Sequence, residues 1–295
     1  MRLTMCWVAL ALLVPGAAQS QRPYDEPLLA VSPALLEYEG DHTVAARFAV
    51  VAGSRRHDLS RAFPASRYWR AEGRGTVALK EELNPDPLAL DLAGGIALSL
   101  AKPRVITFDP ENVDAPGSAM EFDYGDVSLG AQARLEANQA WTEARASLGA
   151  ELIYTHDKQG GLWPFVPSLH AAVGVARPLE SEVRDSLLIR DEESYVRLAG
   201  GVAWHVSADR AWMPRPLRPV WLHAEIDVYR DSGVEDELEA AGVNDGTRVV
   251  LGTAYRLLGT ERPLVHEIFL RWTNGETPAL PAPRKAWMLG IVLAP

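Results

Sequence analysis

Residues 88–100 read Leu-Ala-Leu-Asp-Leu-Ala-Gly-Gly-Ile-Ala-Leu-Ser-Leu, and this stretch decides the fold class. Large apolar side chains stand at alternate positions, and small or polar residues fill the positions between them. Because side chains of a β-strand alternate between two faces, this period predicts a strand with one apolar and one polar face. The stretch is about twice the usual strand length in soluble proteins, and ~9–11 residues allow a tilted strand to cross a membrane.

The same alternation recurs along most of the chain. It is sharpest in residues 69–82, where Trp69, Val77 and Leu79 share one phase while mostly charged and polar side chains fill the other. Turn-forming residues separate the runs, as Asn, Pro and Asp do in 84–87. Further runs lie at 43–52, 119–137, 143–156, 165–177, 195–206, 220–230, 247–258, 264–273 and 285–294. We therefore predict an all-β fold, a single antiparallel transmembrane β-barrel of about 12 strands.

These eleven runs leave one strand unassigned. An odd number would place the chain ends on opposite sides of the membrane, whereas such barrels have an even number, with both ends beside the short periplasmic turns. One solution is a further strand at 186–189, in the long connection 178–193. The other divides 119–137 at 125–126, where the alternation changes phase, although a bulge there would leave the count unchanged. The Glu-rich segment 234–241 is expected to form a short loop helix.

Residues 1–20 have the pattern of a secretory signal peptide. Arg2 precedes an apolar run over 5–14, and small residues follow where a signal peptidase cuts. The run is shorter than the roughly 20 residues of a spanning helix, which disfavours an N-terminal membrane anchor. Cys6 is the only cysteine, and its lipidation would require a longer apolar run ahead of it. We predict that residues 21–295 form the barrel domain and contain no disulfide.

Composition excludes several classes of function. The net charge of −10 argues against a nucleic-acid partner, which would be met by a basic patch. After the signal peptide no apolar stretch is long enough for a spanning helix. No Gly-rich phosphate loop precedes a helix, and the seven histidines lack metal-ligand spacing. We expect no cofactor and no metal, although His223, Glu225 and Asp227 share one face and a weak metal site there is the less favoured reading.

Polar and charged residues fill the phase opposite the apolar set and would line the interior of the barrel. Two interpretations stay open: a conduit whose charges select or orient a small solute, or an interior closed by ion pairs and side chains. The candidate lumen-lining residues are Arg70, Glu72, Arg74, Lys80, Arg134, Glu136, Arg145, Glu151, Arg197, Glu225, Asp227, Arg256 and Arg271, and Gln132, Glu143, Arg248 and Glu267 share their phase.

Two further groups of residues bear on function. Ser168 and His170 share one strand face, and outer-membrane lipid hydrolases use a serine and a histidine on barrel strands. Sequence identifies neither an orienting third group nor oxyanion donors, so we expect no catalytic site. Most aromatic residues fall near strand ends, where amphipathic rings form a belt at the lipid headgroups, but Trp221 lies in the lumen phase. The belt candidates are Trp69, Trp141, Tyr154, Trp163, Trp204, Trp272 and Trp287.

Residues 124–135, Tyr-Gly-Asp-Val-Ser-Leu-Gly-Ala-Gln-Ala-Arg-Leu, are similar to the GD-strand-LG-strand signature of one family of outer-membrane barrels. That family is named for a suspected part in the meta-cleavage pathway of phenol degradation, and the resemblance implies a barrel with a role in transport. Such barrels usually end in an aromatic residue that the barrel-assembly machinery reads. This chain departs from the pattern, because residues 290–295 read Gly-Ile-Val-Leu-Ala-Pro.

Together these features predict a non-enzymatic β-barrel in the outer membrane of a Gram-negative bacterium, surrounded by outer-membrane lipid. It would be a porin-like channel or binding protein for a small solute that the sequence does not identify. One alternative is an outer-membrane lipid hydrolase. The other is a soluble or surface-associated β-domain, a binding or structural module that would turn its alternating leucines inward.

Overall fold

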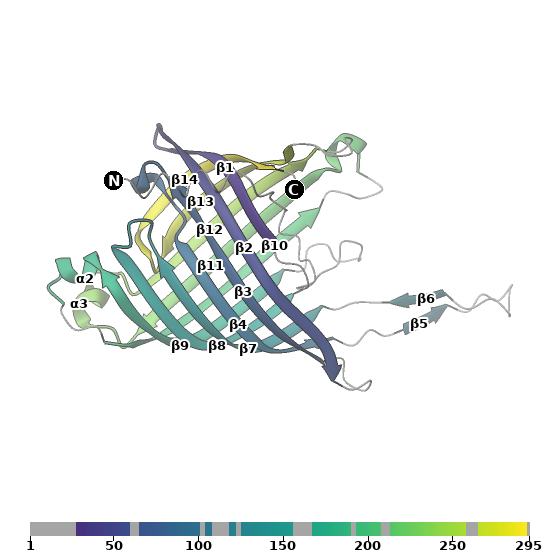
Figure 1. The fold of residues 1–295 in the computed structure, drawn as a ribbon, viewed down its shortest axis with the longest axis horizontal. Coiled ribbons are helices and arrows are strands. Elements are labelled where there is room, and N and C mark those ends of the chain that lie inside the picture. Colours follow the sequence, from purple (N-terminus) through teal and green to yellow (C-terminus); the bar gives the residue numbers. More distant parts are fainter. Residues whose placement is uncertain are drawn as a thin grey trace.

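The computed structural model describes residues 28–59, 65–100, 104–107, 118–121, 125–155, 167–189, 193–207, 213–257 and 265–293. Twelve antiparallel strands close into one barrel (Figure 1). They are β1 (Leu28–Tyr38), β2 (Asp41–Leu59), β3 (Ala65–Ala78), β4 (Leu88–Ser99), β7 (Asp126–Ala137), β8 (Glu143–Thr155), β9 (Ser168–Ser181), β10 (Tyr195–Ser207), β11 (Val220–Ser232), β12 (Asp245–Arg256), β13 (Val265–Thr277) and β14 (Leu280–Leu293). The predicted fold class and strand number are confirmed. The predicted signal peptide, 1–20, lies outside the described residues.

The connections define two ends of the barrel. The helix end carries the turns after β1, β3, β7, β9, β11 and β13, which include η2 (Glu81–Leu83), α2 (Glu182–Ser186) and α3 (Asp236–Ala240). The hairpin end carries η3 (Arg215–Leu217) and the hairpin of β5 (Arg104–Thr107) and β6 (Ser118–Glu121), which projects away from the barrel (Figure 1). The expected loop helix is confirmed as α3. Among the described residues, no helix is long and apolar enough to span a membrane.

The outer face of the barrel wall is apolar. On β4 the alternating leucines and Ile96 point outward and are exposed, whereas Asp91 and the alanines beside it are buried inside. Other exposed outward side chains include Val44, Val77, Leu129, Leu148, Val173, Leu198, Leu222, Leu251, Leu270 and Leu289. The soluble-domain alternative required these side chains to face inward, and the structure has the opposite arrangement. An exposed apolar surface of this extent is typical of a protein that contacts lipid or another apolar partner.

The unassigned barrel strand is β1, and neither solution offered from the sequence supplies it, although the run 119–137 does divide near residue 125, into β6 and β7. Residues 186–189 form the last residue of α2 and the turn that follows it, not a strand. The segment before Gly125 contributes β6, which pairs with β5 outside the barrel. β1 was missed because its alternation is weak: Leu35 points outward and is 46% exposed, while its neighbour Leu36 points inward and is fully buried. Pro33, which cannot donate a ladder hydrogen bond, also argued against a strand.

Adding β1 also changes the expected order of the connections. β1 begins and β14 ends at the hairpin end, so both ends of the barrel chain lie on one side, as an even number of strands requires. However, the two shortest turns, after β1 and after β13, lie at the helix end, and the long connection after β4 lies beside the chain ends. The expectation that short turns accompany the chain ends is therefore wrong, because the additional strand β1 moves the chain ends to the side of the longer connections.

The barrel closes along a short seam. β1 pairs with β14 at four positions, from Ala34 with Gly290 to Glu37 with Trp287, whereas β1 pairs with β2 along its whole length. Inside the wall, a cluster of small and apolar side chains fills the space beside this seam. Its buried members are Ala34, Leu36, Ala45, Ala78, Phe269, Met288 and Val292. The barrel interior is thus apolar on the seam side, and its charged residues gather elsewhere.

Candidate functional site: a charged cavity in the barrel

The interior of the barrel contains a cavity of about 630 Å³. Its lining comes from the inward phase of the strands and from the connection between β3 and β4. The arginines that line it are Arg47, Arg70, Arg74, Arg134, Arg197, Arg248, Arg256 and Arg271, and the acidic residues are Glu72, Asp86, Asp91, Glu136, Glu151, Glu225, Asp227, Glu267 and Glu276. The two signs of charge are nearly balanced. The volume falls in the ~300–1,000 Å³ range of small-molecule pockets.

Most of the candidate lumen residues line this cavity. The structure places Arg70, Glu72, Arg74, Arg134, Glu136, Glu151, Arg197, Glu225, Asp227, Arg256 and Arg271 on its wall. Arg145 lies in a second, much smaller pocket toward the helix end. Lys80 lies outside both pockets, beyond the end of β3, where it is exposed and pairs with Asp41 at 3.3 Å. Sequence reasoning missed Arg47 and treated Asp86 only as a turn residue.

One ion-pair network joins β4, β7, β10 and β11, and it includes a pair between β7 and β10, which lie three strands apart. Arg197 donates two hydrogen bonds of 2.7 Å to the carboxylate of Asp231, and its Nη1 lies 3.5 Å from Glu136. Glu136 also pairs with Arg134, which lies 3.5 Å from Asp91. Because bidentate and charge-assisted hydrogen bonds hold planar guanidinium groups in one orientation, this part of the wall is rigid.

A second set of contacts reaches across the interior. Tyr68 and Arg70 on β3 donate hydrogen bonds of 3.0 and 2.9 Å to the carboxylate of Glu151 on β8, three strands away around the barrel. Gly130 on β7 makes this possible, because a Cβ there would overlap the Tyr68 hydroxyl. Glycine is required at this position for the close approach of a side chain.

The connection between β3 and β4 folds into the mouth of the barrel and is held there by arginines. Asp86 accepts hydrogen bonds of 2.7 and 3.0 Å from Arg271 and one of 2.9 Å from Thr76, and it also pairs with Arg248. Arg284 on β14 donates 2.8 Å hydrogen bonds to the carbonyl oxygens of residues 81 and 84. Because these arginines stand on β12, β13 and β14, the connection crosses the helix end of the barrel and narrows it.

Electrostatics favour the ionised form of this carboxylate. Burial alone would raise the pKa of Asp86, but the guanidinium groups of Arg271, Arg248 and Arg47 outweigh burial and hold that pKa well below the usual range of aspartate. The connection is therefore held by a carboxylate that is ionised at neutral pH. We call residues 79–87 with their arginine contacts the Asp86 clamp.

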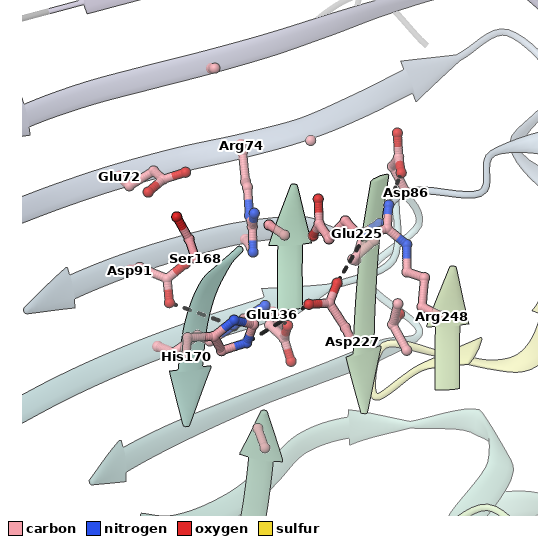
Figure 2. Close-up of a pocket in the computed structure, with 18 of the residues that line it drawn as sticks. Glu72, Arg74, Asp86, Asp91, Glu136, Ser168, His170, Glu225, Asp227 and Arg248 are labelled. Carbon is pink, nitrogen blue, oxygen red and sulfur yellow. Dashed lines mark hydrogen bonds and ion pairs between the residues drawn. The ribbon is translucent and has the colours of Figure 1, made fainter. Parts of the chain in front are cut away.

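In the middle of the cavity, charges of opposite sign face each other. Figure 2 shows Arg74 extending from β3 into the cavity, with Glu225 and Asp227 from β11 nearby. Glu225 and Asp227 stand two positions apart on the inward face of β11, and Arg248 lies 3.7 Å from Asp227. His170 on β9 lies 3.8 Å from Asp227, and both side chains lie over Gly201, where a Cβ would overlap them.

Ser168 and the histidines His170, His205 and His223 line the cavity. The 3.8 Å from His170 Nε2 to Asp227 is longer than a hydrogen bond. His223 lies 3.2 Å from Glu225 and its ring lies 4.4 Å from that of His205. Among the described residues, no group of three or more His, Cys, Asp or Glu side chains is arranged to hold a metal ion.

The tryptophans divide as the strand phase predicted. Trp221 lines the cavity, and the guanidinium of Arg256 lies 4.3 Å from the centre of its ring, a cation–π arrangement. Trp69 and Trp287 point outward and are about half exposed, and Trp141 is exposed in the turn between β7 and β8. Trp163 lies outside the described residues.

Comparison with known proteins finds similarity only among solved structures. No protein-family model and no curated protein matches the sequence. The NanC porin matches with a TM-score of 0.42 and 7% identity, over 90% of this chain and 100% of the porin chain. OprD of Pseudomonas aeruginosa has a TM-score of 0.32 and 8% identity, over 95% and 97%. An anion-selective porin from Comamonas acidovorans has a TM-score of 0.36 and 9% identity, over 90% and 97%. Values this low identify neither a family nor a solute.

Proposed function

We propose that this protein is an outer-membrane β-barrel that passes or binds a small polar solute. The observation that carries the proposal is the division of one wall into two surfaces, an apolar exterior and a charged interior around a cavity of about 630 Å³. An apolar outer band on a closed barrel suits lipid, because closure leaves no unpaired strand edge in hydrocarbon. The charged interior suits water and a polar solute.

The proposal extends to location and partners. The protein would lie in the outer membrane of a Gram-negative bacterium after removal of residues 1–20, in contact with lipid and inserted by the barrel-assembly machinery. The similarity of residues 124–135 to the family linked to phenol meta-cleavage stays a hypothesis, which a transport assay with phenolic compounds would test. The Asp86 clamp favours a narrow or gated passage over a wide one, because it crosses one mouth of the barrel.

The experiment is reconstitution of the purified, detergent-refolded protein. We expect heat-modifiable gel migration, extraction only with detergent, and discrete conductance steps in planar bilayers. Folded protein that remains silent in bilayers and binds no small polar solute would contradict the proposal, as would recovery in the periplasmic fraction without detergent. The hydrolase alternative is tested in the same preparation: lipid hydrolysis that disappears in Ser168→Ala and His170→Ala would replace our proposal with a catalytic one.

A further inference from the structure

Most charges that line the cavity are compensated by a partner within the wall. Arg70 pairs with Glu151, and Arg197 with Asp231. The remaining close pairs are Arg134 with Asp91 and Glu136, Arg271 with Asp86, Arg248 with Asp86 and Asp227, and Arg256 with Glu267. Such pairs hold the wall together but leave little charge for a solute.

Arg74 differs from these arginines. Within the described residues it makes no direct hydrogen bond or ion pair, although it lines the cavity and its side chain is exposed there. Arg47, whose charge also acts on Asp86, likewise makes no direct hydrogen bond or ion pair among the described residues, and it lies on the inward face of β2 two residues from Ala49, the strand partner of Arg74. These two guanidinium groups form the positive side of the cavity.

Glu72 neighbours Arg74 on the inward face of β3, and Glu225 and Asp227 line the cavity from β11. Around the ring of twelve strands, β3 and β11 lie six steps apart in both directions, so these groups stand on opposite walls. All three side chains line the same cavity, and Figure 2 shows Arg74 projecting into it from the β3 side. Among the described residues Glu225 contacts His223 but pairs with no arginine, and Asp227 shares Arg248 with Asp86, so this wall keeps a net negative charge.

The space between the two walls is kept open by small residues. Ala199, Gly201 and Ala203 form the inward face of β10, and Ala172 and Gly174 continue it on β9. A larger side chain at Gly201 would displace His170 and Asp227. A solute that enters the cavity therefore meets Arg74 on one wall and the carboxyl pair on the other.

We propose that this level of the cavity binds a compact zwitterionic solute, whose carboxylate contacts Arg74 and whose cationic group contacts Glu225 and Asp227. The inference rests on the proposed function and deepens it, because it names the class of solute. A simple anion gains the contact with Arg74 but is repelled by the carboxyl pair. A simple cation gains the contact with the carboxyl pair but is repelled by Arg74. Only a molecule that carries both charges makes a favourable electrostatic contact with each wall and is repelled by neither.

The test measures binding to the purified full-length protein in detergent by isothermal titration calorimetry. The probes are glycine, 4-aminobutyrate and 6-aminohexanoate, with hexanoate and hexylammonium as singly charged controls. We expect the best zwitterion to bind at least about tenfold more tightly than either control, since one charge-assisted hydrogen bond contributes about this factor. Equal affinities for zwitterions and singly charged probes would overturn the inference.

Variants assign the two walls. Arg74→Gln and Glu225→Gln are each expected to lower zwitterion affinity about tenfold, and Arg74→Lys, which keeps the charge, is expected to retain most of it. Lys80→Gln and Asp41→Asn remove one charge of each sign outside the cavity and serve as matched controls. Heat-modifiable migration confirms folding of each variant. Unchanged affinity in both cavity variants would overturn the inference, and so would equal losses in the controls.

Conductance separates the inference from the proposed function. If the wild-type protein conducts potassium chloride but shows no preference for zwitterions, the zwitterion site is refuted and the channel remains. If the folded protein neither conducts nor binds any probe, including the neutral sugar arabinose, the proposed function fails and the inference fails with it. Block of the potassium chloride current by 6-aminohexanoate, relieved in Arg74→Gln, would support both.

Discussion

The Asp86 clamp offers the sharpest test of how the interior is organised. Replacing Asp86 with Asn keeps the size of the side chain and removes its charge. The amide can still accept from Thr76 or one arginine, but the two-bond contact with Arg271 and the pairing with Arg248 lose their charged acceptor. Among the described residues Arg271 pairs with no other carboxylate, so the substitution leaves a buried guanidinium without a counter-ion.

The size of the effect follows from this loss. Removing one partner of a buried ion pair costs about 3–5 kcal/mol, because the remaining charge stays desolvated. At about 1.4 kcal/mol per factor of ten, that energy changes the ratio of docked to undocked connection by roughly two to three and a half orders of magnitude. The barrel wall itself keeps its strand pairing, so we expect the clamp to open while the barrel remains folded.

Two assays detect this opening. Single-channel conductance in planar bilayers is expected to rise in Asp86→Asn but not in Asp41→Asn, which removes an exposed charge at the same end. In a Leu83→Cys background, where the side chain is buried in the docked connection, a membrane-impermeant maleimide is expected to react faster after Asp86→Asn. If conductance and labelling rate both match those of the parent proteins, the clamp does not hold the connection and the reasoning is wrong.

The pH dependence of the clamp has a defined sign. A carboxylate whose pKa is lower in the folded state contributes stability above its unfolded pKa of about 3.9, and this contribution disappears as the pH falls toward the folded pKa. Because the pKa of Asp86 lies well below the usual range, the stability difference between wild type and Asp86→Asn is expected to stay constant from pH 8 to pH 5. Urea unfolding at several pH values measures it, and a decline already at pH 6 would contradict the assignment.

Two further substitutions test the wall. Leu148→Lys places a charge on the outward face, where the leucine is 67% exposed. We expect it to lower the free energy of unfolding in lipid vesicles by about 2–4 kcal/mol. Ser147→Lys, whose side chain faces the cavity, should lower that free energy far less. Equal costs in urea titrations would show that the outer face is not in lipid. Gly130→Ala is expected to displace the Tyr68 hydroxyl from Glu151 and to lower stability by about 1–3 kcal/mol, and unchanged unfolding would refute that close approach.

The strands that the sequence revealed are those whose two faces have different surroundings. On β4 the leucines face outward and Asp91 faces the interior, so the alternation is strong. On β1 both Leu35 and Leu36 are apolar, because the interior beside the seam is apolar as well. A period of two disappears where both faces need the same kind of side chain, and no reading of β1 alone would have recovered it.

The site was predictable in its composition and not in its pairing. Strand phase located Arg70 and Glu151 on the inward face, but their contact depends on which strands stand opposite, and that is a property of the closed barrel. The role of Asp86 was hidden for the same reason, because its arginines come from strands far along the chain. The residue types typical of a turn gave no sign that the turn enters the barrel.

The seam between β1 and β14 has a consequence for assembly of the barrel. Almost every other strand pairs with its neighbour in the chain, so those ladders close short loops, whereas the seam joins the two ends of the described chain through four paired positions. Among the ladders of the barrel, the seam closes the longest loop and has the fewest paired positions, so its formation loses the most chain entropy and gains the fewest hydrogen bonds. We therefore expect it to form last. For the same reason its amide hydrogens are expected to exchange with solvent before those of the other ladders, so the strand pair that closes the barrel is also its least stable strand pair.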